Sequence, residues 1–226
     1  MDKLLHDFDL SLKQIEQFQK YYQYLVEENK KINLTSIIEE TEAYIKHFYD
    51  SMMVSKFIDL NNSSICDIGS GAGFPSIPLK ILIPSLKVTI IEPTLKRIKF
   101  LNQLCLLLGL ENVELINGRA EEEIASRREK YDYVTARAVA NLPVLLELCV
   151  PYVKKNGKFV ALKGYNYQEE LETSKNAIKT LDLVYDIKTY QLPLDMGSRA
   201  LILFTKQKET SKIYPRKYAI IKKKPL

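Results

Sequence analysis

The sequence predicts an α/β fold in which seven strands form a mostly parallel sheet with helices on both faces. Three observations predict it. The first five β-like runs alternate with helical stretches, and this alternation requires crossover connections between parallel strands. A glycine-rich turn follows the first run, at the position where open α/β sheets bind ligands. The last two runs are joined only by LPLDMGSR, which is too short for a crossover, so they should pair antiparallel at one edge.

Two helices precede every predicted strand. An amphipathic helix over residues 11–31 begins with Ser11 and Gln14 in the spacing of a capping box, and apolar residues recur along it at intervals of three and four. A polar break separates it from a second helix over about 41–57. Residues 1–60 are therefore expected to form an N-terminal helical appendage.

The remaining elements follow in order within an expected core domain of residues 61–205. We expect strands at 64–68, 87–92, 113–116, 131–136, 159–163, 184–192 and 200–205. Helices are expected between the first five strands, at 75–83, 94–108, 120–128 and 141–153. No internal repeat interrupts this order, and a chain of 226 residues has the length of one domain with a short appendage.

Composition narrows the class of protein. With 46% hydrophobic and 27% charged residues, the chain matches globular proteins, and it is long enough to bury a core without disulfides or a structural metal. The three cysteines include no CxxC pair, which favours a reducing compartment. No apolar run approaches the ~18 residues of a membrane span, and the start MDKLLHDFDL lacks the apolar stretch of a signal peptide. We therefore expect a cytoplasmic protein that binds neither a metal nor a membrane.

Basic residues concentrate at the end of the chain, although the net charge is only +5. Residues 206–226 carry eight lysines and arginines against one acid, Glu209, whereas residues 1–205 have a slight acidic excess. Such a basic C-terminal arm is typical of proteins that bind a polyanion, most often nucleic acid. The alternatives are a tail that only improves solubility, or a tail in which residues 214–221 pack back on the sheet.

The most informative segment is the turn after the first strand, CDIGSGAGFP. Its glycines, Gly69, Gly71 and Gly73, allow positive φ and let the backbone approach a ligand closely. A dinucleotide-binding loop would read G-x-G-x-x-G, but the third glycine position is Phe74, whose bulk crowds a pyrophosphate. Asp67 would repel phosphates and can bind an ammonium group.

An acidic residue at the end of the second strand complements this loop. Glu92 follows Gly73 by about 20 residues, the spacing at which an acid holds a ribose diol in Rossmann-like folds. Together these features fit a nucleoside that carries an amino acid and no pyrophosphate, and S-adenosylmethionine is such a molecule. The alternatives are a tight strand–helix turn without a ligand and a dehydrogenase with a variant nucleotide loop.

Short motifs along most of the chain are similar to those of one family. They are Asn33-Leu34-Thr35-Ser36, His47-Phe48-Tyr49-Asp50-Ser51, residues 67–79, Lys96-Arg97 with Phe100-Leu101, Gly118-Arg119-Ala120-Glu121, Ala136-Arg137-Ala138, Ala161-Leu162-Lys163-Gly164 and Tyr214-Pro215-Arg216-Lys217. In this order they resemble the bacterial ribosomal RNA small-subunit methyltransferase G family, also called glucose-inhibited division protein B. The resemblance implies a class I Rossmann-like methyltransferase fold. It also implies S-adenosylmethionine-dependent methylation of guanine N7 in 16S ribosomal RNA, near the decoding centre.

The resemblance further implies cofactor contacts at Gly69, Phe74, Ala120, Glu121 and Arg137. Open α/β sheets bind ligands at the carboxyl ends of their strands, which indicates where the parts of the cofactor lie. Asp67 is expected to accept from the methionine ammonium group, and Glu92 from the ribose hydroxyls. Glu121 and the backbone of Ala120 follow the third strand, where the adenine is expected, and the three loop glycines complete the cofactor site.

Two basic residues end the fourth and fifth strands and are the expected catalytic residues. Arg137 should face the transfer site, where it can bind the methionine carboxylate, a substrate phosphate or guanine O6. Lys163 is expected to contact RNA. Either side chain can instead form a salt bridge with a neighbouring acid. His47 and Asp50 lie three residues apart on one helix, where a structural hydrogen bond is favoured over catalysis.

The chemistry implied by the resemblance needs few reactive groups. Guanine N7 has a lone pair and no proton, so its attack requires no general base, and positioning carries most of the catalysis. The chain accordingly lacks the Cys-Pro pair that a covalent cytosine mechanism would need. The expected substrate is 16S ribosomal RNA or the small ribosomal subunit, and the expected enzyme is a monomer. A methyltransferase for another RNA or for a small molecule, and a non-catalytic RNA-binding module, remain alternatives.

Overall fold

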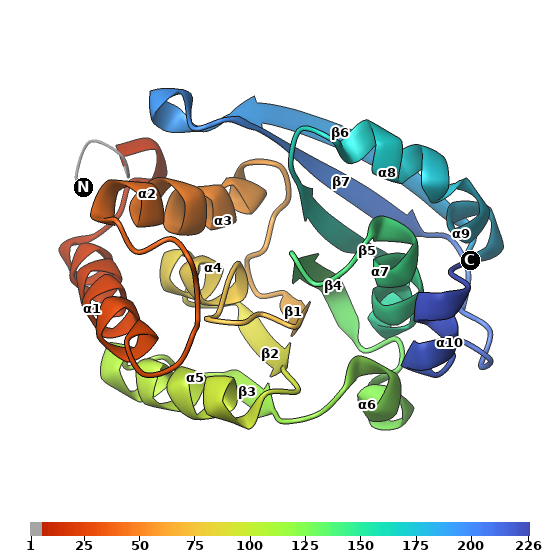
Figure 1. The fold of residues 1–226 in the computed structure, drawn as a ribbon, viewed down its shortest axis with the longest axis horizontal. Helices are drawn as coiled ribbons and strands as arrows, with labels where there is room; N and C mark the ends of the chain where they lie inside the picture. Colours follow the sequence, from red (N-terminus) through yellow and green to blue (C-terminus); the bar gives the residue numbers. More distant parts are fainter. Residues whose placement is uncertain (1–5) are drawn as a thin grey trace.

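A seven-stranded sheet runs through the middle of the computed structural model, which describes residues 6–226 (Figure 1). The strand order is β3-β2-β1-β4-β5-β7-β6, and only β7 runs antiparallel to its neighbours. The strands are β1 (Ser64–Ile68), β2 (Lys87–Ile91), β3 (Val113–Ile116), β4 (Tyr131–Arg137), β5 (Val153–Lys163), β6 (Leu183–Gln191) and β7 (Ser198–Lys206). The predicted strands and the antiparallel pair at one edge are confirmed, although β5 begins earlier than predicted.

Helices cover both faces of the sheet (Figure 1). On one face α1 (Leu12–Asn29) packs on α4 (Ser76–Leu82) and α5 (Leu95–Leu108). On the other face α7 (Leu142–Cys149) contacts α6 (Ala120–Arg127), α8 (Tyr167–Thr173), α9 (Lys175–Thr180) and α10 (Tyr218–Lys223). Two apolar clusters result, one on each side of the sheet, and neighbouring residues of β1 point into different clusters: Ile65 into the first and Cys66 into the second.

The N-terminal helix α1 begins as predicted. The Ser11 side chain accepts a hydrogen bond from the backbone N–H of Gln14, and the Gln14 side chain accepts one from the backbone N–H of Ser11, which confirms the capping box. Gln14 also donates to the carbonyl oxygen of Ile81 on α4 at 2.8 Å. Phe18 and Tyr21 are fully buried, so α1 shares the first apolar cluster with the sheet.

The second helix predicted over about 41–57 is confirmed in extent, but its type changes along the segment. The segment consists of α2 (Glu40–Ala43), the π-helix η2 (Tyr44–Tyr49), α3 (Asp50–Met52) and the 3-10 helix η3 (Met53–Lys56). The π-helix buries every one of its residues except Lys46. A regular surface helix would turn a larger share of its residues towards solvent. The change from α-helix to π-helix thus occurs in the stretch where almost every side chain is buried.

Three short helices were not predicted from the sequence: α8, α9 and α10. Each has six or seven residues, and a helix of that length shows too little apolar periodicity to be recognised. The helix predicted at 141–153 ends earlier, as α7 at Cys149. A 3-10 turn, η4 (Val150–Tyr152), follows it and contains Pro151, which cannot continue an α-helix. The other short turns are η1 (His6–Phe8) and η5 (Pro193–Asp195).

The C-terminal residues pack against the second face of the sheet. Arg216 donates to the carboxylate of Glu147 from its backbone nitrogen at 2.9 Å, from Nε at 2.7 Å and from Nη2 at 2.5 Å. Glu147 lies on α7 and is fully buried. Lys206, also fully buried, donates to Glu129 at 2.6 Å. Ile221 on α10 has no exposed surface, so the segment is anchored by both ion pairs and apolar contact.

The three-part division into residues 1–60, 61–205 and 206–226 stays a prediction. The N-terminal helices share the first apolar cluster with the sheet, and the C-terminal segment contributes side chains to the second. Within residues 6–226, no helix is both long and apolar enough to cross a membrane.

Candidate active site

The turn between β1 and α4 has positive φ at all three of its glycines, Gly69, Gly71 and Gly73. A methyl group added at Gly73 would lie 2.8 Å from the hydroxyl of Tyr21, and one added at Gly69 would lie 2.8 Å from a methyl carbon of Val139. At Gly71 the same addition would meet no atom of the described residues within 4 Å. Packing within the protein therefore requires glycine at two positions, whereas the third faces open space.

Asp67, at the end of β1, is a fully buried carboxyl group under this turn. Its Oδ2 accepts from the backbone N–H of Ser76 at 3.3 Å. Its Oδ1 has no hydrogen-bond partner within the described part of the chain. Burial raises the pKa of Asp67 to about 7, because the charged form loses its hydration. A cationic group placed here would satisfy the free oxygen and favour the charged form.

Glu92 follows β2 and is almost completely buried. Its carboxylate accepts from the backbone N–H of Gly71 at 3.2 Å and from that of Thr94 at 3.0 Å, and Arg97 lies 3.6 Å away. The acid thus ties the glycine turn to the neighbouring strand. A carboxylate oxygen can accept more than one hydrogen bond, so these contacts leave it able to accept from a ligand as well.

A cavity of about 290 Å³ opens beside the glycine turn. Its lining comes from the carboxyl ends of β1 and β2, from the loop after β3 and from the loop after β4. It includes four predicted cofactor residues: Gly69, Glu92, Ala120 and Glu121. We call it the first cavity. Its position at the carboxyl ends of three parallel strands is where the sequence predicts a ligand.

Phe74 does not line the first cavity. Its ring stacks on His47 with centroids 4.4 Å apart and on Tyr21 with centroids 5.5 Å apart. The guanidinium of Arg137 lies 5.8 Å from the centre of the same ring. The side chain of Phe74 therefore supports the turn from the side of the N-terminal helices, and its predicted contact with a cofactor stays a prediction.

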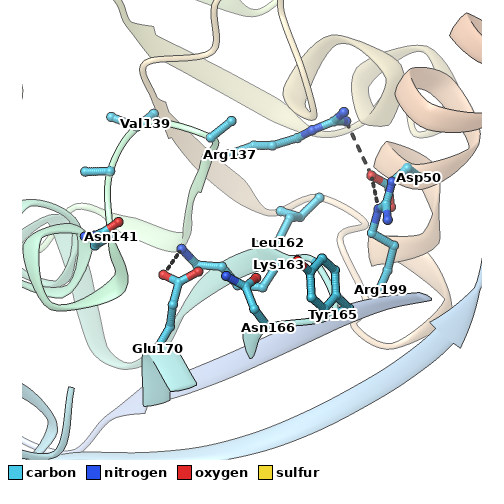
Figure 2. Close-up of a pocket in the computed structure, with 13 residues that line it drawn as sticks. Asp50, Arg137, Val139, Asn141, Leu162, Lys163, Tyr165, Asn166, Glu170 and Arg199 are labelled. Atoms are coloured by element: carbon cyan, nitrogen blue, oxygen red, sulfur yellow. Dashed lines mark hydrogen bonds and ion pairs between the residues drawn. The ribbon is translucent and has the colours of Figure 1, made fainter. Parts of the chain in front are cut away.

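A second cavity, of about 610 Å³, adjoins the first, and the two share Ala138 and Val139 as lining residues. Both predicted catalytic residues, Arg137 and Lys163, line it (Figure 2). Lys163 forms a salt bridge with Glu170 at 2.7 Å. The structure thus brings the ends of β4 and β5 together as expected, with the lysine paired to an acid.

Arg137 and Arg199 both point towards the carboxylate of Asp50 in the second cavity (Figure 2). The guanidinium of Arg137 lies 3.6 Å from Asp50 Oδ2, and the Nε of Arg199 lies 3.4 Å from the same oxygen. The hydroxyl of Tyr190 donates to Asp50 Oδ1 at 2.7 Å. Arg199 and Tyr190 were not predicted as site residues, because they lie on β7 and β6, far along the chain from Asp50.

His47 is held in a structural contact, in agreement with the sequence-based preference. Its Nε2 lies 2.9 Å from the hydroxyl of Thr35, and its Nδ1 lies 3.2 Å from Arg137. Burial, aided by the charge of Arg137, lowers the pKa of His47 to about 3. The ring is therefore neutral near pH 7. Arg137 also donates to the carbonyl oxygen of Lys46 at 2.6 Å, so the π-helix fixes its position.

The fold and the glycine turn together define a class I S-adenosylmethionine-dependent methyltransferase fold, which is Rossmann-like. Solved structures share it. An S-adenosylmethionine-dependent O-methyltransferase from Thermotoga maritima aligns with a TM-score of 0.58 at 18% identity, covering 83% of this chain and 73% of that one. The ribosomal protein L11 methylase of Lactobacillus delbrueckii subsp. bulgaricus aligns with a TM-score of 0.57 at 14% identity, covering 72% of this chain and 79% of that one. At such identities the likeness concerns the fold alone.

Sequence comparison places the chain more narrowly. The family model described as rRNA small subunit methyltransferase G matches residues 14–192. Ribosomal RNA small subunit methyltransferase G of Staphylococcus haemolyticus is 53% identical over 98% of this chain and 93% of its own length. The protein of that name from Oceanobacillus iheyensis is 51% identical over 96% of this chain and 93% of its own length. The chain belongs to the ribosomal RNA small subunit methyltransferase G family, which confirms the resemblance seen in its motifs.

The raised pKa of Asp67 predicts an inverse dependence of stability on pH. Between about pH 4 and 7 the folded protein keeps a proton that the unfolded chain has released, so the free energy of unfolding falls as pH rises through this window. Asp67→Asn should remove this fall and stabilise the protein by roughly 2–4 kcal/mol at pH 8, with little effect at pH 4. Urea denaturation at several pH values measures this difference. Asp195→Asn, at an exposed turn, is the control, and parallel pH profiles for wild type and Asp67→Asn would contradict the burial argument.

Proposed function

We propose that this protein transfers the methyl group of S-adenosylmethionine to N7 of a guanine in 16S ribosomal RNA, near the decoding centre. The main support for the proposal is that the two cavities meet at Ala138 and Val139. The chain also belongs to the ribosomal RNA small subunit methyltransferase G family. One cavity is lined by four of the residues expected to bind the cofactor: Gly69, Glu92, Ala120 and Glu121. The other is lined by basic side chains from the ends of β4, β5 and β7. A methyl group held at their junction is accessible to a base in the second cavity.

The residues around the first cavity suit S-adenosylmethionine. Asp67 does not line the cavity, but among residues 6–226 its buried Oδ1 has no hydrogen-bond partner, and the cofactor's ammonium group would neutralise it. Glu92 lines the cavity and would accept from the ribose hydroxyls. Ala120 and Glu121 line its far side, where the adenine would lie. When bound, the cofactor supplies a methyl group that its sulfonium makes reactive towards a lone pair.

The second cavity would orient the guanine and the nearby phosphates. Arg137 and Arg199 can each present two parallel N–H groups to a phosphate or to guanine O6. Both now share one carboxylate, Asp50, which leaves an excess of positive charge beside the junction. Guanine N7 carries no proton, so no side chain needs to act as a base. The protein's contribution is to hold the base in line with the methyl group and to exclude water.

The proposal extends to the setting of the reaction. The substrate would be 16S ribosomal RNA within the small subunit or its precursor, the enzyme would act as a monomer, and it would work in the cytoplasm. Within residues 6–226 no group of histidine, cysteine or acidic residues could hold a metal ion. The alternative substrates are another RNA and a small molecule, and mapping of the methylated atom distinguishes them from 16S ribosomal RNA.

The direct test is to map methylation in ribosomal RNA. Small subunits and naked 16S RNA from cells that lack this protein would be incubated with it and with S-adenosylmethionine. We expect one new N7-methylguanosine, which borohydride–aniline cleavage locates near the decoding centre. Methyl incorporation at a different atom or in a different RNA would support the alternative. A protein that binds the cofactor but modifies neither substrate would overturn the proposed RNA target.

The glycine turn provides a test of cofactor binding with a matched control. Gly71 and Gly109 have the same φ of +61°, and a Cβ atom added at either position meets no atom of residues 6–226 within 4 Å. Gly71→Val and Gly109→Val therefore carry a similar backbone cost of about 1–2 kcal/mol. Only Gly71→Val should block S-adenosylmethionine, and calorimetric titration should show at least a tenfold weaker affinity. Equal affinities of the two variants would remove the assignment of the cofactor to this turn.

Arg137→Ala should reduce methyl transfer far more than it reduces stability. Loss of an orienting group typically lowers the rate about 100-fold. Stability should fall less, because Arg199 and the hydroxyl of Tyr190 still hold the buried carboxylate of Asp50 when Arg137 is replaced. Lys154→Ala is the control, because Lys154 forms only an exposed pair with Asp132. Initial rates at saturating RNA and cofactor, together with denaturation curves, separate the two effects. Activity of Arg137→Ala within about twofold of wild type would favour a purely structural salt bridge.

A further inference from the structure

The C-terminal segment reaches the first cavity. Tyr218, the first residue of α10, lines that cavity together with Ala120 and Glu121. The guanidinium of Arg119 lies 6.0 Å from the centre of the Tyr218 ring. The family model ends at residue 192, so this contact belongs to a part of the chain that the model does not include. We propose that Tyr218 is a cofactor-binding residue whose ring packs against the adenine; this inference rests on the proposed use of S-adenosylmethionine.

The placement of the other cavity residues identifies which part of the cofactor Tyr218 would contact. Gly69 and Glu92 line the cavity where β1 and β2 end, and they suit the methionine and the ribose. Ala120 begins α6, after β3, so the cavity continues from β1 across β2 towards α6. The remaining portion of the ligand at this end is the adenine. A tyrosine ring offers a flat apolar face to a base, and such stacking contributes about 1–3 kcal/mol.

Contacts on both sides of Tyr218 fix its position beside the first cavity. Arg216, two residues earlier, is bound to the buried Glu147 by three hydrogen bonds. Ile221, three residues later, is fully buried in the second apolar cluster. Tyr218 itself is half-buried. Because it is held from both sides, its ring is positioned before any ligand arrives, which lowers the entropy lost on binding.

The same helix also borders a groove that leads away from the junction of the cavities. This groove is lined by Tyr218 and Lys222 on α10 and by Val139 and Asn141 in the loop after β4. One basic residue of the C-terminal segment, Lys222, thus lines a groove that shares Tyr218 and Val139 with the first cavity. Removing the segment should consequently weaken cofactor binding as well as RNA binding, in contrast to a tail that serves RNA alone.

The test measures affinity in the full-length protein by calorimetry, with S-adenosylmethionine, S-adenosylhomocysteine and adenosine as ligands. Tyr218→Ala should weaken all three about tenfold, the loss of one stacking contact. Tyr218→Phe keeps the ring and should stay within about twofold of wild type. Ile220→Ala, at an exposed position of the same helix, controls for a general effect on α10. In the methylation assay, Tyr218→Ala should raise the KM for the cofactor and leave kcat at saturating cofactor nearly unchanged.

Each outcome separates this inference from the proposed function. If wild type binds S-adenosylmethionine and Tyr218→Ala binds it equally well, the role of Tyr218 is refuted and the proposed function stands. If Ile220→Ala weakens binding as much as Tyr218→Ala, the effect comes from the helix, and the stacking contact is likewise refuted. If wild type fails to bind S-adenosylmethionine, the proposed function itself is overturned. Melting temperatures of all variants show that the titrated proteins are folded.

Discussion

The turn between β1 and α4 has no room for side chains at two of its glycines, and the elements around it depend on that tight fit. Gly73 lies against Tyr21 of α1, and Gly69 lies against Val139 in the loop after β4. The hydroxyl of Tyr21 also donates to the carbonyl oxygen of Ala72 at 2.5 Å. The N-terminal helix therefore holds the backbone of the turn from one side, while the loop that separates the two cavities closes on it from the other.

A single buried carboxylate organises the second cavity. Asp50 comes from the N-terminal segment, yet its partners lie on three strands: Arg137 on β4, Tyr190 on β6 and Arg199 on β7. Two guanidinium groups thus remain ordered in a half-buried site without repelling each other strongly, because the acid lies between them. The proposed phosphate or guanine ligand would meet guanidinium groups that are already oriented by this carboxylate.

The sequence predicted those features that depend on neighbours along the chain. Alternating strands and helices, the capping box at Ser11 and the glycine turn are local patterns, and each appears where it was expected. The paired side chains in the second cavity are different. Lys163 forms its salt bridge with Glu170, which is only seven residues away in the sequence. Arg199 and Asp50 are far apart in the sequence and come into contact only because β7 lies between β5 and β6. The position of Phe74 under the turn also follows from packing against the N-terminal helices, which no spacing in the sequence encodes.

The attachment of Arg216 to Glu147 has a consequence for biosynthesis. The N-terminal part of a chain is made first and can begin to fold during synthesis, so Glu147 is present before Arg216. Strands β1 to β5 and α7 are therefore synthesised while Glu147 still lacks its arginine partner and while Tyr218 is absent from the first cavity. At that stage the first cavity has its lining from the strand ends but lacks the ring of Tyr218. A truncated translation product would carry the glycine turn, the acidic residues and both arginines of the second cavity, and yet hold an open, unfinished pocket.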